Sequence, residues 1–215
     1  MRSIHVINKL ILEHGILCAK GENNRIQPVH LRQGDMDGAC AIYSLMMGMI
    51  TCGIINRKDA EGLYQKLDGR SSLAKLLKQL TLEGKNEGLV REGLYLSSVH
   101  EVASHTFTSK MRTSYSDAIN NIEYIRENLD NDNPVIIGGL YRRKGGHALL
   151  AVGYEAENEI VSKLFCLDPG YKLPECCYWN SVIYVNANSV KEYKHTYMPN
   201  GNDIKIDECI CIFKK

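Results

Sequence analysis

The hydrophobic period of this chain changes at Pro134, and this change limits the folds that the chain can adopt. Before Pro134, apolar residues recur at helical spacing in 58–67 and 71–82, and helical signals return in 97–104 and 116–129. After Pro134, strand-like segments are separated by turn-forming residues. Helices first and strands last predict an α+β fold of two layers or lobes, with a crevice between them as the usual place for a functional site.

Chain length and the apolar pattern predict one domain. The 215 residues suit a single compact unit over 1–215, with a helical lobe over about 34–133 and a sheet lobe over about 134–215. Residues 39–54 are apolar on nearly all faces, which predicts a helix in the middle of the domain. Residues 1–27 are either a segment that covers the crevice or an ordinary first strand and helix.

Charge and hydropathy exclude several partner classes. The 26 Lys and Arg residues nearly balance 25 Asp and Glu, so no global field would attract nucleic acid or anionic lipid. The longest apolar run, 41–55, is shorter than the ~18–20 residues that a membrane span needs. The first twenty residues lack a signal-peptide core. Eight cysteines in such a chain therefore predict reduced thiols and a cytoplasmic location, with delivery as an effector left open.

Cys40 lies where a polar, acidic stretch gives way to the apolar run, in the segment QGDMDGACAIYS. If the helix begins near Gly38, Asp37 is its N-cap and Cys40 lies in its first turn. Unpaired N–H groups and the helix dipole favour an anion there, so the thiol pKa falls and the side chain becomes a nucleophile. The nearby Asp35 and Asp37 oppose this effect, so the nucleophile needs a cationic partner. Plain core packing is the alternative for any one cysteine.

His147 is the histidine that best supplies this partner. It begins the segment GGHALLAVGY, after two glycines that allow another backbone to approach. The next predicted strand, LFCLDPG, ends on Asp168. Two adjacent strands would thus present an imidazole beside a carboxylate that orients it, as a general base requires. Gly145 and Gly146 are predicted to offer backbone groups to an extended substrate.

These motifs resemble those of papain-like cysteine peptidases. The papain pattern of Gln followed by Cys-Gly-Ser-Cys-Trp-Ala-Phe-Ser is similar to QGDMDGACAIYS, and the papain pattern His-Ala-Val-x-x-Val-Gly-Tyr is similar to HALLAVGY. Bacteriocin-processing peptidase domains similarly combine a Gln-to-Cys segment, a His on an apolar strand and Asp-Pro. The resemblance implies a papain-like fold, in which a helical lobe with a central helix packs on a C-terminal antiparallel sheet lobe.

The resemblance also implies catalytic roles. Cys40 would be the nucleophile, His147 the general base and Asp168 the orienting acid, while Gln33 would donate to the oxyanion beside the Cys40 N–H. The third papain residue is Asn, so Asn180 is an alternative to Asp168. The implied reaction is cleavage of a peptide or isopeptide bond through a thioester, with a protein or peptide as substrate and no cofactor.

Other functions remain open from the sequence. Another acyl-transfer enzyme, such as a deamidase, a transglutaminase-like enzyme or an amidase toxin, would use the same residues. The segment DGAC resembles the Asp-Gly-Asn-Cys of ovarian-tumour-type deubiquitinases, and a binding module with an inactive site is a third alternative. The spacings of Cys176, Cys177, Cys209 and Cys211 do not match zinc knuckles, so no metal site is predicted. The oligomeric state is left open.

Overall fold

The computed structural model describes residues 1–34, 38–61, 70–83, 93–119, 121–142, 145–186, 189–198 and 200–215. Its helices are α1 (Cys40–Thr51), α2 (Arg57–Glu61), α3 (Ser72–Glu83), α4 (Leu96–Thr106) and α5 (Asn121–Asp130). Its strands are β1 (Arg2–Val6), β2 (Leu10–Glu13), β3 (Ile16–Lys20), β4 (Ile26–Pro28), β5 (Met111–Ser116), β6 (Val135–Tyr141), β7 (Gly146–Glu157), β8 (Ile160–Leu167), β9 (Ser181–Tyr184), β10 (His195–Met198) and β11 (Asn202–Lys214).

Six strands close into an antiparallel barrel. They follow one another in the order β7, β6, β11, β10, β9 and β8, and β8 pairs back with β7 to complete the ring. β1 pairs with the second half of β7, and β5 pairs with the second half of β11, so both strands extend the barrel sheet. A separate small sheet consists of β2, β3 and β4.

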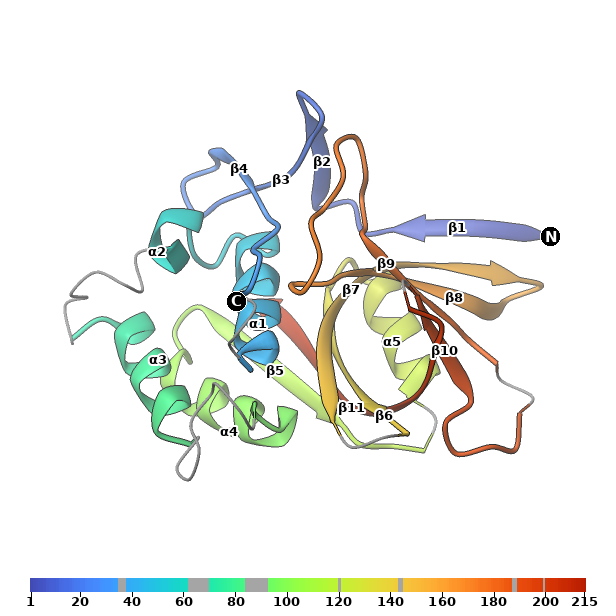
Figure 1. Cartoon of the computed structure of the whole chain (residues 1–215). Helices are drawn as coiled ribbons and strands as arrows, with labels where there is room; N and C mark the ends of the chain where they lie inside the picture. The colour runs from blue at the N-terminus through green and yellow to red at the C-terminus, as the bar shows by residue number, and fades with distance from the viewer. Residues whose placement is uncertain are drawn as a thin grey trace.

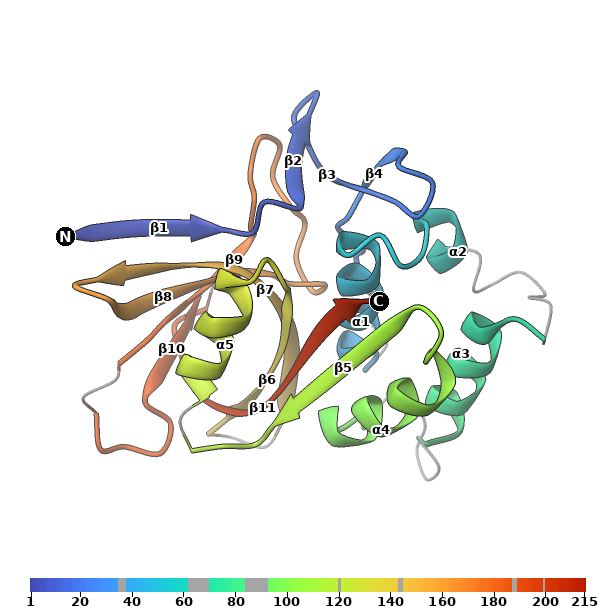
Figure 2. The ribbon, with the colours of Figure 1, turned by 180° about the vertical axis from the view of Figure 1, so that it is seen from behind.

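The helices lie beside this barrel. Figure 1 shows α2, α3 and α4 on one side, β8, β9 and β10 on the other, and α1 between them. α5 packs against β11, β7 and β6, and Figure 2 shows it in front of these strands. Both faces of β11 are buried around Cys209–Ile212, because the strand lies between the barrel interior and the packed helices.

The prediction of a papain-like α+β fold, with a helical lobe followed by a sheet lobe, is wrong. The molecule is mostly β, and the strands form a closed barrel rather than an open C-terminal sheet. Strands also occur throughout the chain: β1–β4 precede the first helix, and β5 lies between α4 and α5. The division of segments at Pro134 failed because strand partners come from both sides of it, with β1 joining β7 and β5 joining β11.

The expectation of a central helix over 39–54 is confirmed by α1. Ten of its twelve residues are buried, and it packs against β7, β6 and β3. A Cβ atom at Gly48 would lie 2.3 Å from Ile212 Cδ1, so the glycine permits α1 to lie close to β11. This packing fixes the position of Cys40, the first residue of α1, relative to the barrel strands.

Several local predictions also hold. The helix expected over 71–82 is α3, and it is capped by Ser71, because the Ser71 Oγ accepts the Ala74 N–H at 3.1 Å. The strands expected after Pro134 correspond to β6, β7, β8, β9 and β11, whereas β10 was not expected. The proposed cap Asp37, its neighbour Asp35 and the second half of the helix expected over 58–67 lie outside the described residues. Among the helices that are described, none is long and apolar enough to cross a membrane.

Candidate active site

Cys40 is the first residue of α1, and two contacts join this end of the helix to β7. The Ala148 N–H donates to Cys40 Sγ at 3.4 Å, and Ser44 Oγ donates to the Ala148 carbonyl at 3.2 Å. Residues 40 and 44 are one helical turn apart and lie on the same face of α1. Together they bind the backbone N–H and the backbone carbonyl of Ala148. The cysteine is thereby set beside His147, the neighbour of Ala148 on β7.

The structure brings together Cys40, His147 and Asp168, as predicted. Asp168 directly follows β8, and the last residue of that strand, Leu167, pairs with Leu150 of β7. Its Oδ1 atom lies 2.8 Å from His147 Nε2. Since Nε2 is engaged there, Nδ1 is the nitrogen left for the hydrogen bond with the Cys40 thiol.

The surroundings of Cys40 favour its thiolate. Burial by itself would raise the thiol pKa, but the hydrogen bond and charge of His147 outweigh burial, and the Ala148 and Ala41 N–H groups add to them. The net effect lowers the pKa of Cys40 below its ordinary value. The helix start contributes in the expected direction, since its N–H groups have no acceptor one turn earlier.

His147 and Asp168 are shifted in complementary directions. Burial opposes the imidazolium, but the hydrogen bonds to Asp168 and Cys40 raise the pKa of His147 to about 10. Burial likewise opposes the Asp168 carboxylate, yet His147, Tyr197 and the Gly170 N–H together lower its pKa. The His147 side chain is 17% exposed and that of Asp168 is 0% exposed. These shifts favour the thiolate, the imidazolium and the carboxylate over their neutral forms.

Asn180 does not replace Asp168 beside the histidine. Its side chain instead holds the Asp168 backbone, donating to the Asp168 carbonyl at 2.9 Å and accepting the Asp168 N–H at 2.7 Å. His30 Nε2 also lies 2.9 Å from that carbonyl, and burial lowers the pKa of His30 so that it is neutral. Both residues therefore support the turn that carries Asp168.

Gln33, Gly145 and Gly146 line the same cleft as Cys40 and His147. The cleft has a volume of about 530 Å³ and extends along β6 towards the start of α4. The Gln33 N–H donates to the Pro169 carbonyl at 2.9 Å, which places this segment next to the turn after Asp168. Both glycines are exposed. Gly145 has a φ of +135°, and a Cβ atom added there would have no heavy atom within 4 Å. Their roles toward an oxyanion or a substrate backbone stay predictions.

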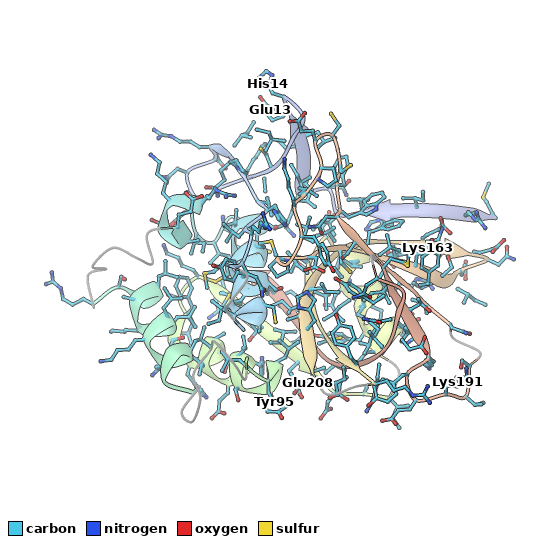
Figure 3. All side chains as sticks on the ribbon, in the orientation of Figure 1. Glu13, His14, Tyr95, Lys163, Lys191 and Glu208 are labelled. Atoms are coloured by element: carbon cyan, nitrogen blue, oxygen red, sulfur yellow. The ribbon has the colours of Figure 1, made fainter. Side chains whose placement is uncertain are left out.

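The far wall of the cleft is the segment 93–96 at the start of α4. The Glu208 carboxylate on β11 accepts the Leu96 N–H at 2.8 Å and the Ser97 N–H at 3.2 Å, and so fixes the helix start to the barrel. Figure 3 labels Tyr95 and Glu208 at this end of α4. Tyr95 is 77% exposed, so the wall presents an aromatic ring to solvent.

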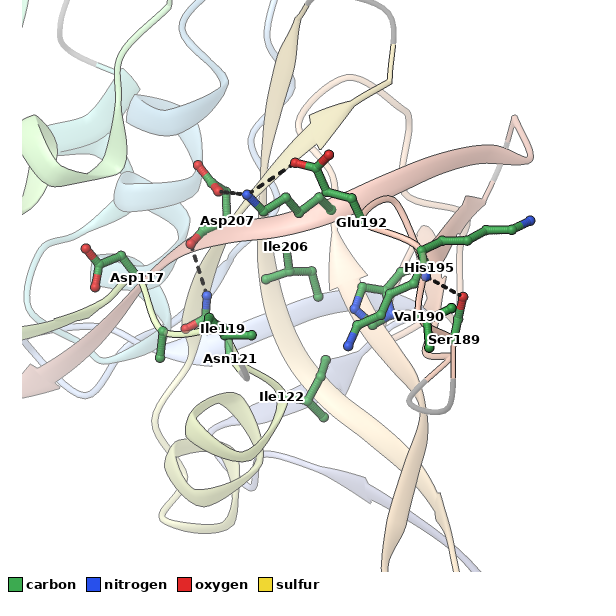
Figure 4. A pocket seen from close by; sticks show the side chains of 14 residues that line it. Asp117, Ile119, Asn121, Ile122, Ser189, Val190, Glu192, His195, Ile206 and Asp207 are labelled. Carbon is green, nitrogen blue, oxygen red and sulfur yellow. Dashed lines mark hydrogen bonds and ion pairs between the residues drawn. The ribbon is translucent and has the colours of Figure 1, made fainter.

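A second cavity of about 310 Å³ contains another buried histidine but a different chemistry. It lies between the start of α5, β11 and the segment before β10 (Figure 4). Lys205 Nζ forms ion pairs with the nearby carboxylates, at 2.9 Å from Asp207 and 3.7 Å from Glu192. Burial lowers the pKa of His195 to about 4, and its Nδ1 accepts the Asn186 N–H. This histidine is therefore a neutral packing residue.

Sequence reasoning missed two residues that support the site, His30 and Tyr197, and it offered Asn180 in a different role. His30 and Asn180 hold the Asp168 backbone, and the Tyr197 hydroxyl donates to Asp168 Oδ2. Tyr197 lies on β10, the strand that the pattern did not predict. No signal in the sequence separates this tyrosine from the other eleven, because its role arises from barrel closure.

Comparison with other proteins gives no family assignment. No protein-family model matches the chain, and none of the curated proteins matches it significantly. Among the described residues, no group of three or more His, Cys, Asp or Glu side chains is placed to hold a metal ion. The geometry of the site is therefore the basis for any functional assignment.

Proposed function

We propose that the protein is a thiol hydrolase that cleaves a peptide or isopeptide bond through a Cys40–His147–Asp168 mechanism. The observation that carries the proposal is the Cys40 thiol at a helix start, beside a histidine that a buried carboxylate orients and that lowers the thiol pKa. The lowered pKa of the thiol and the raised pKa of the imidazole support a reactive ion pair.

The reaction proceeds in two halves. The Cys40 thiolate attacks the amide carbonyl, and the oxyanion is received by the Cys40 N–H and the Gln33 side-chain amide. His147 gives its Nδ1 proton to the leaving amine, which departs as the C–N bond breaks and leaves a thioester on Cys40. His147 then takes a proton from water as the water attacks the thioester. The carboxylic product leaves, and the thiolate–imidazolium pair is restored.

A protein segment is the substrate class that the cleft suits. The space of about 530 Å³ lies open beside Cys40 and continues past the exposed Gly145 and Gly146 to Tyr95. An extended chain would approach the two glycines through its backbone. Gly146→Val is therefore expected to raise KM several-fold at temperatures where the variant stays folded, since its Cβ would lie 3.3 Å from Leu140 Cδ2. Gly145 has positive φ and is a poor site for this test.

The decisive test is selective alkylation of the thiol. Iodoacetamide at pH 6, followed by peptide mass spectrometry, should modify Cys40 well ahead of the exposed Cys176, which serves as the internal control. The preference should disappear in His147→Ala. Equal labelling of the two cysteines in the wild type, or a preference that survives in His147→Ala, would count against an enzyme and favour a binding module.

A product assay separates hydrolysis from other acyl transfers. The protein and its Cys40→Ala variant are incubated with a denatured proteome, and peptide termini are compared by mass spectrometry. New termini that depend on Cys40 support a peptidase or isopeptidase. Mass shifts without new termini would instead indicate a deamidase or a transglutaminase-like enzyme working with the same residues.

A further inference from the structure

The Asp168 carboxylate accepts hydrogen bonds from two groups besides His147. Its Oδ1 atom accepts from His147 Nε2 at 2.8 Å and from the Gly170 N–H at 2.7 Å. Its Oδ2 atom accepts the Tyr197 hydroxyl. The two oxygens are thus divided, one facing the histidine and the other facing the tyrosine.

Tyr197 also contacts the histidine directly. Its ring meets the His147 ring at 65° with centroids 6.2 Å apart, and it meets the Tyr141 ring at 60° and 6.1 Å. The Tyr197 side chain is 2% exposed. One residue therefore holds the carboxylate through its hydroxyl and limits the tilt of the imidazole through its ring.

Barrel closure fixes the place of this tyrosine. On β10, Tyr197 is paired with Ile183 of β9 on one side and Asn202 of β11 on the other. Its carbonyl also accepts the Gly201 N–H at 2.9 Å. The backbone is held from both neighbouring strands, so the hydroxyl has little freedom to leave the carboxylate.

We infer that Tyr197 is a positioning residue, which holds the Asp168 carboxylate in the rotation that directs Oδ1 at His147. This inference rests on the function proposed above. A fully buried carboxylate needs donors at both oxygens, and a neutral hydroxyl supplies one without competing for the imidazolium charge. Without it, Oδ2 would be buried and unsatisfied, and the carboxylate would gain by turning away from the histidine.

The test compares two tyrosine-to-phenylalanine variants that each remove one hydroxyl. Tyr197→Phe removes the donor to Asp168, and the control Tyr154→Phe removes a partly buried hydroxyl that donates to the exposed Asp130 at 2.5 Å, elsewhere on the barrel. The readout is the rate of Cys40 alkylation by iodoacetamide from pH 5 to pH 11, with each variant held below its own unfolding midpoint.

The positioning role predicts a change in the pH profile. In Tyr197→Phe the alkaline limit of the imidazolium–thiolate pair should move down by about one pH unit. Tyr154→Phe should keep the wild-type profile. An unchanged limit in Tyr197→Phe overturns the inference, and so does an upward shift, because that would mean the hydroxyl only weakens the carboxylate as a partner.

Failure of the inference is distinguishable from failure of the proposed function. If wild-type Cys40 shows no selective alkylation at pH 6, the proposed function fails. If the wild type is selectively alkylated and Tyr197→Phe has the same alkaline limit, only the positioning role fails. A measurement on the wild type covers the case in which Tyr197→Phe does not fold. The inference requires a solvent-protected Tyr197 hydroxyl proton in NMR spectra, with a nuclear Overhauser contact to the His147 ring, and its absence contradicts the inference.

Discussion

Helix α1 has a cysteine at each end, and the two thiols differ in almost every chemical respect. Cys40 at the first position contacts His147 and the Ala148 N–H, and its pKa is lowered. Cys52 at the C-cap is 5% exposed, its Sγ lies 3.6 Å from the Ile212 carbonyl, and burial raises its pKa to about 12. One helix therefore carries a group arranged to ionise and a group arranged to stay neutral.

The difference shows what turns a buried thiol into a candidate nucleophile. Both cysteines lose solvation, so burial opposes the thiolate at either end. The start of the helix offers N–H donors and an imidazolium, whereas its end offers carbonyl acceptors. Because burial raises both pKa values, the partner decides the outcome: His147 outweighs burial at Cys40, whereas the charges of Lys9 and Lys214 do not outweigh burial at Cys52.

Removing each thiol in turn is the strongest test of this comparison. Cys40→Ala should reduce the cleavage rate on the order of 10⁶-fold, because the nucleophile is lost. Cys52→Ala should leave the rate intact and lower the free energy of unfolding by about 1–2 kcal/mol through lost packing. Proteolysis assays and urea unfolding measure the two effects. Loss of activity in Cys52→Ala at full folding would break the comparison.

Neutralising the carboxylate should have the next largest effect. Asp168→Asn should slow cleavage by about 10²- to 10⁴-fold, because an amide cannot stabilise the imidazolium and favours the wrong tautomer. The matched control is Asp130→Asn, since Asp130 also accepts a tyrosine hydroxyl but lies away from Cys40. Steady-state kinetics on both variants test the assignment, and equal rates would remove Asp168 from the mechanism.

The pH dependence of Cys40 alkylation should show a wide plateau. The lowered pKa of Cys40 means that the thiolate appears at a pH below its ordinary titration, and the raised pKa of His147 means that the imidazolium persists until about pH 10. The ion pair therefore exists between these two limits and is lost above about pH 10. A stopped-flow profile in which Cys40 and Cys52 titrate together would erase the contrast between the helix ends.

The smallest expected effect concerns two buried hydroxyls on α1. Ser44 reaches across to the Ala148 carbonyl, whereas Thr51 donates to Met47 within its own helix at 2.8 Å. Ser44→Ala should reduce kcat/KM about fivefold, the equivalent of one hydrogen bond of about 1 kcal/mol, because the helix start is less firmly held on β7. Thr51→Ala should change stability alone, and similar kinetic losses in both would argue against this positioning role.

Some features of the molecule were accessible from local pattern. The apolar run after Cys40 gives a buried helix because no face of it is polar enough for solvent. Ser71, directly before α3, caps that helix, and the segments after Pro134 form strands. The order Cys40, His147 and Asp168 was also visible, since each stands at the end of a predicted element. These predictions depend on neighbours within a few residues.

Other features depend on contacts between distant segments. The resemblance to papain-like enzymes predicts an open sheet lobe. In the structure the sheet closes into a ring instead, because β8 pairs with β7 and β11 pairs with β6. β10 has only four residues and was not predicted, because its apolar pattern is too short to separate from a loop. The strands β1 and β5 gain their place only from partners more than ninety residues away in sequence.

The sequence by itself determined which groups are chemically able to react, and where each stands in a local element. It placed a thiol at the start of an apolar helix, an imidazole at the start of a strand and a carboxylate at the end of the next. Only the tertiary structure decided how these groups are held. Tyr197, Asn180 and His30 reach Asp168 from separate segments because barrel closure brings those segments together, and such long-range pairing leaves no periodic signal in the chain.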